Sequence, residues 1–209
     1  MNKRTDLGNS IPPKFIPATA FLLALLISSP LQAQFMVQSV NLAYLVQRAD
    51  IIVQGYVASV RHEPLPGYPN IPTVVVSINV ERMLRGPAKN TYTFREIFLG
   101  LRTKEGKQSY QIGQRLLLFL PAASQLGLSS PVGIEQGRFH IATGSGSTAM
   151  VANEFGNYGL FKDVEKSASK SGIRFTKRES QTAATKNRPV PLNDFVSLVQ
   201  SLTSMPRIR

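Results

Sequence analysis

The chain is 209 residues long, carries a formal net charge of +12, and contains neither cysteine nor tryptophan. Its length suits one domain with a tail, and the missing cysteine excludes disulfide bonds, thiolate catalysis and thiolate metal ligands. The charge favours contact with anionic partners, and the alternative is that it only keeps the protein soluble.

The first 33 residues have the pattern of an export signal. A basic leader precedes the apolar run 21–27, and Pro30 and Ala33 then supply a helix breaker and a small residue for cleavage. The alternative is an uncleaved membrane anchor, but the apolar stretch between Pro17 and Pro30 is too short to cross about 30 Å of hydrocarbon. We therefore predict export, with cleavage near Ala33, to the periplasm or the extracellular space.

A short helix is predicted over residues 40–48, where three apolar side chains fall on one helical face and Ser39 can cap the first turn. Those side chains are Leu42, Leu45 and Val46.

Residues 48–60 and 73–86 predict two paired strands, around which we expect the fold to be organised. The second strand has aliphatic side chains at alternate positions, which places them on one face of a sheet: Val74, Val76, Ile78 and Val80. Gly55 marks a bend or a close approach of another segment in the first strand. Four prolines within 63–72 predict a surface loop between the two strands.

Four further strands are predicted over residues 91–98, 116–120, 133–143 and 148–152. The run 116–120 is uninterrupted and apolar, which is typical of a strand buried on both faces. The glycine- and serine-rich turn 144–147 joins the last two strands into a β-hairpin. These elements predict a small antiparallel sheet that closes or curls.

The C-terminal part differs in composition. Residues 162–191 are basic, rich in small side chains and poor in large apolar ones, which predicts a flexible linker. A closing amphipathic helix is predicted over 192–205, with one apolar stripe: Phe195, Leu198, Val199 and Leu202. We thus expect an export signal over 1–33, a β domain over 34–161, the linker and the helix.

Catalytic and metal motifs are sparse. Two histidines, His62 and His140, lack close ligand spacing, so we expect surface histidines and no metal or other cofactor. The turn 144–147 fits neither a nucleophile elbow nor a phosphate loop. The carboxylates considered for hydrolysis are expected to be solvated: Glu81, Glu96, Glu135 and Glu154.

A run of basic residues within the predicted linker is a candidate binding surface. As a helix it would present a cationic stripe to an anionic membrane or polymer, and the alternative is a solvated linker. The residues are Lys166, Lys170, Arg174, Lys177 and Arg178.

The order of segments 49–57, 74–80 and 110–120 resembles the netrin-like and metalloproteinase-inhibitor type of oligomer-binding-fold (OB) barrel. It is also similar to exported bacterial proteins in which a Gly-x-x-Gln-Gly-x-Phe stretch follows, as in residues 133–139. The resemblance covers about residues 49–141 and implies a mainly β fold with flanking helices, built as a partly closed OB-like barrel. Inhibitors of that group chelate the protease metal through an N-terminal cysteine, so their mechanism is not implied here.

We expect an exported, non-enzymatic binding protein that uses the barrel face, the proline-rich loop around Tyr68 or the basic run. The expected partners are an anionic envelope polymer, a membrane surface or an acidic protein, and nucleic acid is disfavoured by export. One alternative is a secreted hydrolase, which buried carboxylates or a carboxylate–histidine pair meeting in one pocket would favour. Another is a cysteine-free protease regulator.

Overall fold

The structure is a computed structural model that describes residues 38–98 and 110–208, and the predicted export signal lies outside them. The β-strands are β1 (Ile51–Leu65), β2 (Tyr68–Arg85), β3 (Thr91–Ile97), β4 (Arg115–Leu120), β5 (Arg138–Thr143), β6 (Ala149–Asn153) and β7 (Val190–Pro191). The α-helices are α2 (Leu42–Arg48), α3 (Val164–Lys170), α4 (Lys177–Ala183) and α5 (Leu192–Leu202), and a 3₁₀ turn, η1, spans Ser145–Ser147.

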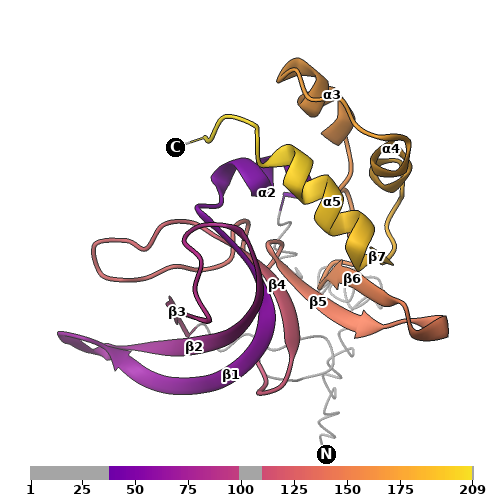
Figure 1. Cartoon of the computed structure of the whole chain (residues 1–209). Helices are drawn as coiled ribbons and strands as arrows, with labels where there is room; N and C mark the ends of the chain where they lie inside the picture. The colour runs from indigo at the N-terminus through magenta and orange to yellow at the C-terminus, as the bar shows by residue number, and fades with distance from the viewer. Residues whose placement is uncertain (1–37, 99–109, 209) are drawn as a thin grey trace, which may run out of the picture. The chain divides into compact units, whose positions relative to one another are not determined.

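The strands form one seven-stranded antiparallel sheet in the order β3-β2-β1-β4-β5-β6-β7, which confirms the predicted mainly β class. The sheet curls strongly through β1 and β2 (Figure 1) but is not closed. A single parallel bridge from Arg95 to Leu128 joins β3 to the β4–β5 connection. The OB-like barrel therefore stays a prediction.

The predicted pairing of β1 with β2 is confirmed, and it runs almost the full length of both strands. Val74, Val76 and Ile78 are buried together on one face, as their alternation indicates. A Cβ atom at Gly55 would lie 2.1 Å from the backbone oxygen of Asn79, so only glycine permits this close approach of the strands.

The proline-rich segment 63–72 differs from the surface loop that we expected. The ladder continues to a pair between Leu65 and Tyr68, and only Pro66 and Gly67 form the turn. Pro64 and Pro72 lie directly opposite each other. Because the two prolines face each other, the N–H groups that they lack fall at a single position of the ladder. The strand pairing therefore continues past them.

Two apolar cores lie on opposite faces of the sheet, and β4 contributes to both. Leu117 and Phe119 pack with α2, α5, β5 and β6, whereas Leu116, Leu118 and Leu120 pack with β1, β2 and β3. This confirms the prediction that the apolar run is a strand buried on both faces. The predicted helices α2 and α5 are also confirmed, and both belong to the first core.

The predicted flexible linker, 162–191, contains the helices α3 and α4 instead. Val164 and Ala168 are fully buried in the first core, and Thr176 and Glu179 form a reciprocal capping box at the start of α4. The few and small apolar side chains of this segment are sufficient to order it because α2 and α5 supply the apolar surface against which α3 and α4 pack.

Candidate functional site

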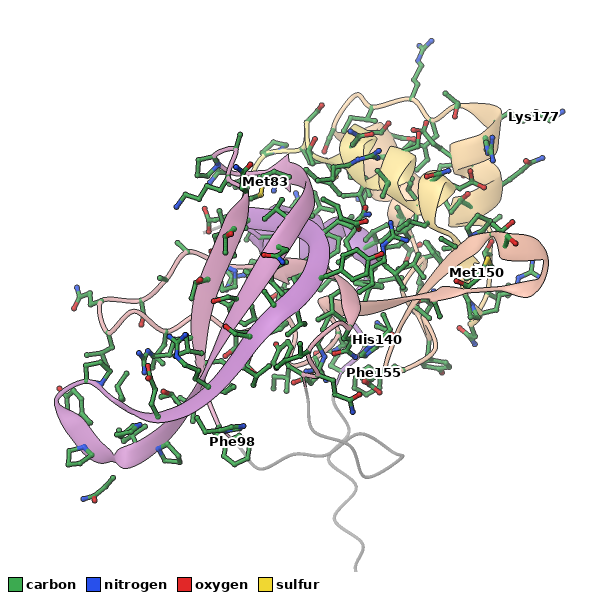
Figure 2. The ribbon with its side chains drawn as sticks, turned by 60° about the horizontal axis from the view of Figure 1, so that its bottom comes forward. Met83, Phe98, His140, Met150, Phe155 and Lys177 are labelled. Atoms are coloured by element: carbon green, nitrogen blue, oxygen red, sulfur yellow. The ribbon has the colours of Figure 1, made fainter. Side chains whose placement is uncertain are left out.

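The five basic residues predicted as a binding surface lie on α3, on α4 and on the connection between them. We call Lys166, Lys170, Arg174, Lys177 and Arg178 the cationic face. All five are exposed, and α3 contacts α4. Figure 2 shows Lys177 pointing away from the protein. The structure therefore gathers these cations on two neighbouring elements.

The local sequence explains why the cations face solvent. Val164 and Ala168 turn one side of α3 into the first core, and Lys166 and Lys170, four residues apart, share another side of the helix. In the connection to α4, Ile173 and Phe175 pack against the same core on either side of Arg174.

A groove of about 450 Å³ runs beside α4. Its lining includes three basic residues, two threonines and one carboxylate: Lys177, Arg178, Arg188, Thr182, Thr185 and Asp194. Arg188 was not among the predicted binding residues, although it lies in the same basic segment. Its position beside α4 depends on the turn into β7, which sequence spacing does not reveal.

Within residues 38–98 and 110–208, only one member of the cationic face takes part in an ion pair. Arg178 Nε lies 2.5 Å from Asp194 Oδ1 at the start of α5. The remaining four positive charges are uncompensated in the described part of the chain. They generate a positive potential that an anionic ligand can neutralise.

Tyr68, the other predicted binding residue, is 47% exposed at the end of the β1–β2 hairpin. The hairpin end and the α3–α4 pair lie at opposite ends of the described unit (Figure 1). A groove of about 620 Å³ beside the hairpin includes His62, Pro69 and Phe98, and the His62 and Phe98 rings meet edge to face at 4.8 Å. Tyr68 and the cationic face are thus separate surfaces.

A second group of polar and charged side chains is buried or half-buried, and the sequence did not predict it. We call Glu96, Tyr110, Glu135, Arg138 and Glu154 the Arg138 cluster. Arg138 is only 2% exposed, and its Nη2 lies 2.6 Å from Glu135 Oε2 and 3.7 Å from Glu154 Oε1. Its guanidinium carbon lies 4.8 Å from the centroid of the Tyr110 ring. One cation therefore compensates a group of carboxylates.

Glu96 is the buried carboxylate on the β3 side of this cluster. Its Oε2 accepts a hydrogen bond of 3.2 Å from the Tyr110 hydroxyl. Burial and the charge of Glu135 raise the pKa of Glu96 to about 7, against the opposing effects of Arg138 and Tyr110. Glu96 is consequently divided between protonated and ionised forms near neutral pH, a property that general acid–base groups require.

Glu135 reaches the cluster through an unusual backbone. Gly133, Ile134 and Glu135 have successive φ values of 72°, 49° and 70°. A β-branched residue such as Ile134 rarely adopts this left-handed region. Burial and the charge of Glu154 raise the pKa of Glu135, although Arg138 opposes the shift. The chain thus adopts a strained backbone where it positions this half-buried carboxylate.

The Gly-x-x-Gln-Gly-x-Phe stretch fixes this loop. Gln136 accepts a hydrogen bond from the backbone of Val40 at 2.8 Å and donates one to Gln38 at 3.0 Å. A Cβ atom at Gly137 would lie 2.8 Å from the backbone oxygen of Val132. The stretch therefore has a structural role that ties the loop to the segment before α2.

His140 connects the cluster to β4. Its Nε2 lies 2.6 Å from Glu154 Oε1, and its Nδ1 lies 2.8 Å from Gln114 Nε2. Because Gln114 Oε1 accepts from the backbone of Gln111 at 3.3 Å, the Gln114 amide is oriented to donate to Nδ1. This assigns the tautomer in which Nε2–H donates to Glu154.

The prediction of solvated carboxylates is wrong for Glu96, which is only 7% exposed. Glu135 and Glu154 are half-buried, and so is His140, which we expected at the surface. The sequence held one signal, because Glu96 shares a strand face with the buried Phe94. Glu135 gave no such signal, since a left-handed loop has no periodicity.

In the described ranges, no group of three or more His, Asp or Glu side chains is arranged to hold a metal ion. No helix there is long and apolar enough to span a membrane.

Comparisons with protein-family models, with curated proteins and with solved structures give no match. The resemblance to netrin-like barrels therefore stays a prediction.

Proposed function

We propose that the protein is an exported, non-enzymatic binding protein whose cationic face holds an anionic component of the cell envelope. The observation that carries this proposal is the exposure of five basic side chains on α3, α4 and their connection, four of them without an ion pair among the described residues. After cleavage near Ala33 the chain keeps 21 basic and 11 acidic residues, and the resulting net charge of +10 adds long-range attraction toward such a ligand.

The ordered structure of residues 162–191 favours a binding role over the alternative of a solvated linker. A flexible linker would disperse its charges. Here α4 is capped and packs on α5, and α3 packs on α2, so the two helices hold the charges in a fixed array. A fixed array loses less conformational entropy on binding. The same charges serve solubility equally well when they are dispersed, so their ordering is the feature that solubility does not explain.

The proposal is tested by chromatography of the full chain on an immobilised polyanion at increasing salt. The variant K166Q/K170Q/R174Q/K177Q removes the four uncompensated charges and keeps the Arg178–Asp194 pair. We expect strong retention of the wild type at low salt, elution as screening increases, and markedly earlier elution of the variant. Equal retention of both proteins, or retention indifferent to salt, would contradict the proposal.

A second candidate function is hydrolysis, and one observation favours it. Glu96 and Glu135 are removed from solvent around Arg138, and Glu154 pairs with His140, which is the convergence expected of a carboxylate enzyme. Against it, Glu135 and Glu154 are each already bound to a basic side chain and Glu96 to Tyr110. Structural ion-pair networks shift pKa values in the same way.

The hydrolase candidate is tested by screening the full chain against glycoside, ester and peptide substrates. Any activity that disappears in E96Q, while far-ultraviolet circular dichroism is unchanged, would support it. The exposed substitution E165Q is the matched control, because Glu165 lies on α3 outside the cluster. Absence of turnover across the three substrate classes would contradict the hydrolase candidate.

A further inference from the structure

We infer that the groove beside α4 binds the acidic groups of a polysaccharide. Lys177, Arg178 and Arg188 supply its positive charges, and Asp194 competes with the ligand for Arg178. This inference rests on the proposed function, because the groove shares Lys177 and Arg178 with the cationic face. It adds where the ligand binds and what chemical class the ligand belongs to.

The cations of the groove come from two segments, and both segments are anchored. Lys177 and Arg178 open α4, and Glu179 fixes this turn by accepting hydrogen bonds from Ser197 at 2.9 Å and from Ser201 at 2.7 Å. The backbone oxygen of Arg188 accepts a bond of 3.0 Å from Asn157, which is itself buried. The walls are therefore held in place before a ligand arrives, which lowers the entropic cost of binding.

Asp194 partly neutralises the groove from within. Its carboxylate is 14% exposed and lies 2.5 Å from Arg178 Nε, whereas the Arg178 side chain is 74% exposed. Arg178 is therefore accessible to an incoming anion, which has to compete with Asp194 for it. With three cations and one carboxylate, the groove remains positive. A ligand carboxylate or phosphate can bind Lys177 and Arg188 without displacing an internal partner.

The lining also offers groups that suit sugar hydroxyls. Thr185 donates its hydroxyl proton to the backbone oxygen of Gln181 at 3.3 Å, so its oxygen remains able to accept, whereas Thr182 is only 6% exposed. The amide of Gln181, exposed on the same helix, can both donate and accept. Cations next to neutral acceptors and an amide match a polymer that carries acidic groups and hydroxyls together.

A membrane surface fits this face less well. The large exposed apolar side chains of the described residues lie elsewhere, and residues 162–206 contribute none of them. A helix that lies on a bilayer needs an exposed apolar face, and α3 and α4 bury theirs against the first core. Single-stranded nucleic acid is disfavoured for a related reason, since this face presents no exposed aromatic ring on which bases could stack.

The test uses two charge-matched double variants of the full chain. K177Q/R188Q removes two charges from the groove, and K166Q/K170Q removes two from α3. Affinity for polygalacturonate, a uronic-acid polymer, is measured by calorimetry at low salt. We expect about a tenfold loss for K177Q/R188Q and about a twofold loss for K166Q/K170Q, because charges that converge in a groove act together on one anionic group.

Asp194 supplies a variant with the opposite expected effect. D194N frees Arg178, so we expect an affinity for polygalacturonate about two- to threefold higher than that of the wild type. Thermal unfolding followed by circular dichroism shows whether each variant keeps its fold. An unchanged or lower affinity in a folded D194N would overturn the role of Asp194 as competitor.

The outcomes separate this inference from the proposed function. Equal losses in the two double variants would overturn the groove while leaving the cationic face as the binding surface. Tighter binding to anionic phospholipid vesicles or to a single-stranded oligonucleotide than to polygalacturonate would overturn the polysaccharide. No salt-dependent binding of the wild type to any of these polyanions would overturn the proposed function itself.

Discussion

Two groups of charged side chains in this protein differ in solvent exposure and in pairing. On the cationic face they are exposed, and four of the five lack an ion pair within the described residues. In the Arg138 cluster the central cation is 2% exposed, and carboxylates surround it. An exposed charge keeps its hydration and contributes little to folding, whereas a buried charge loses hydration and depends on its partners. The first arrangement leaves charge available for a ligand, and the second directs it into the fold.

Replacing Arg138 should have the largest effect on stability. R138M keeps much of the side-chain volume but leaves Glu135, Glu154 and Glu96 without their shared cation. We expect a loss of about 3–5 kcal/mol in the free energy of unfolding, measured by urea denaturation. The double variant E135Q/R138M should recover part of it, because it removes one uncompensated carboxylate. A loss below about 1 kcal/mol in R138M would show that the carboxylates do not depend on Arg138.

Glu96 should make stability depend on pH in the neutral range. The folded protein raises its pKa from the ordinary 4.5 to about 7, so the protonated form is favoured by folding. Its stabilising contribution is complete below pH 4.5 and is lost as pH rises through about 7, by about 3 kcal/mol in total. The free energy of unfolding should therefore fall between pH 5 and pH 8 in the wild type and much less in E96Q. Parallel curves for the two proteins would contradict this assignment.

Glu179 should have a smaller effect with the opposite pH dependence. Burial alone would raise its pKa, but hydrogen bonds from Thr176, Ser201 and Ser197 lower it overall. Stability from this carboxylate is therefore present above its ordinary pKa and is lost on acidification. E179A should cost about 1–2 kcal/mol at neutral pH by urea denaturation, because it removes the capping box of α4 and the acceptor of the Ser197 and Ser201 hydroxyls. E165A removes an exposed carboxylate that accepts from Ser180, and it should cost far less.

The contrast between the two regions also shows what the sequence could predict. Strand alternation located β2, because burial of one face imposes a period of two on a strand. An uninterrupted apolar run located β4, because both faces of that strand are buried. The basic residues of the cationic face were found because they are close together along the chain. Arg138 on β5 and Glu96 on β3 have three strands between them in the sheet order, and they interact only because the sheet curls, which local patterns do not encode. The helices α3 and α4 were missed because α3 packs on α2 and α4 packs on α5, and both partners lie outside the segment whose composition predicted a linker.

Neutralising the cationic face should have the smallest effect on stability, and this result would distinguish that face most clearly from the Arg138 cluster. The variant K166Q/K170Q/R174Q/K177Q removes four charges, yet none of them forms an ion pair among the described residues, and all four side chains are exposed. We expect its free energy of unfolding to lie within about 0.5 kcal/mol of the wild type by urea denaturation, while its retention on a polyanion falls. Removal of the mutual repulsion among these cations shifts this small change toward greater stability. A loss of 2 kcal/mol or more would mean that the charges order α3 and α4, and that weaker retention reports unfolding of the face. Unchanged stability with weaker retention would show that the positive charge on this face serves a ligand and not the fold.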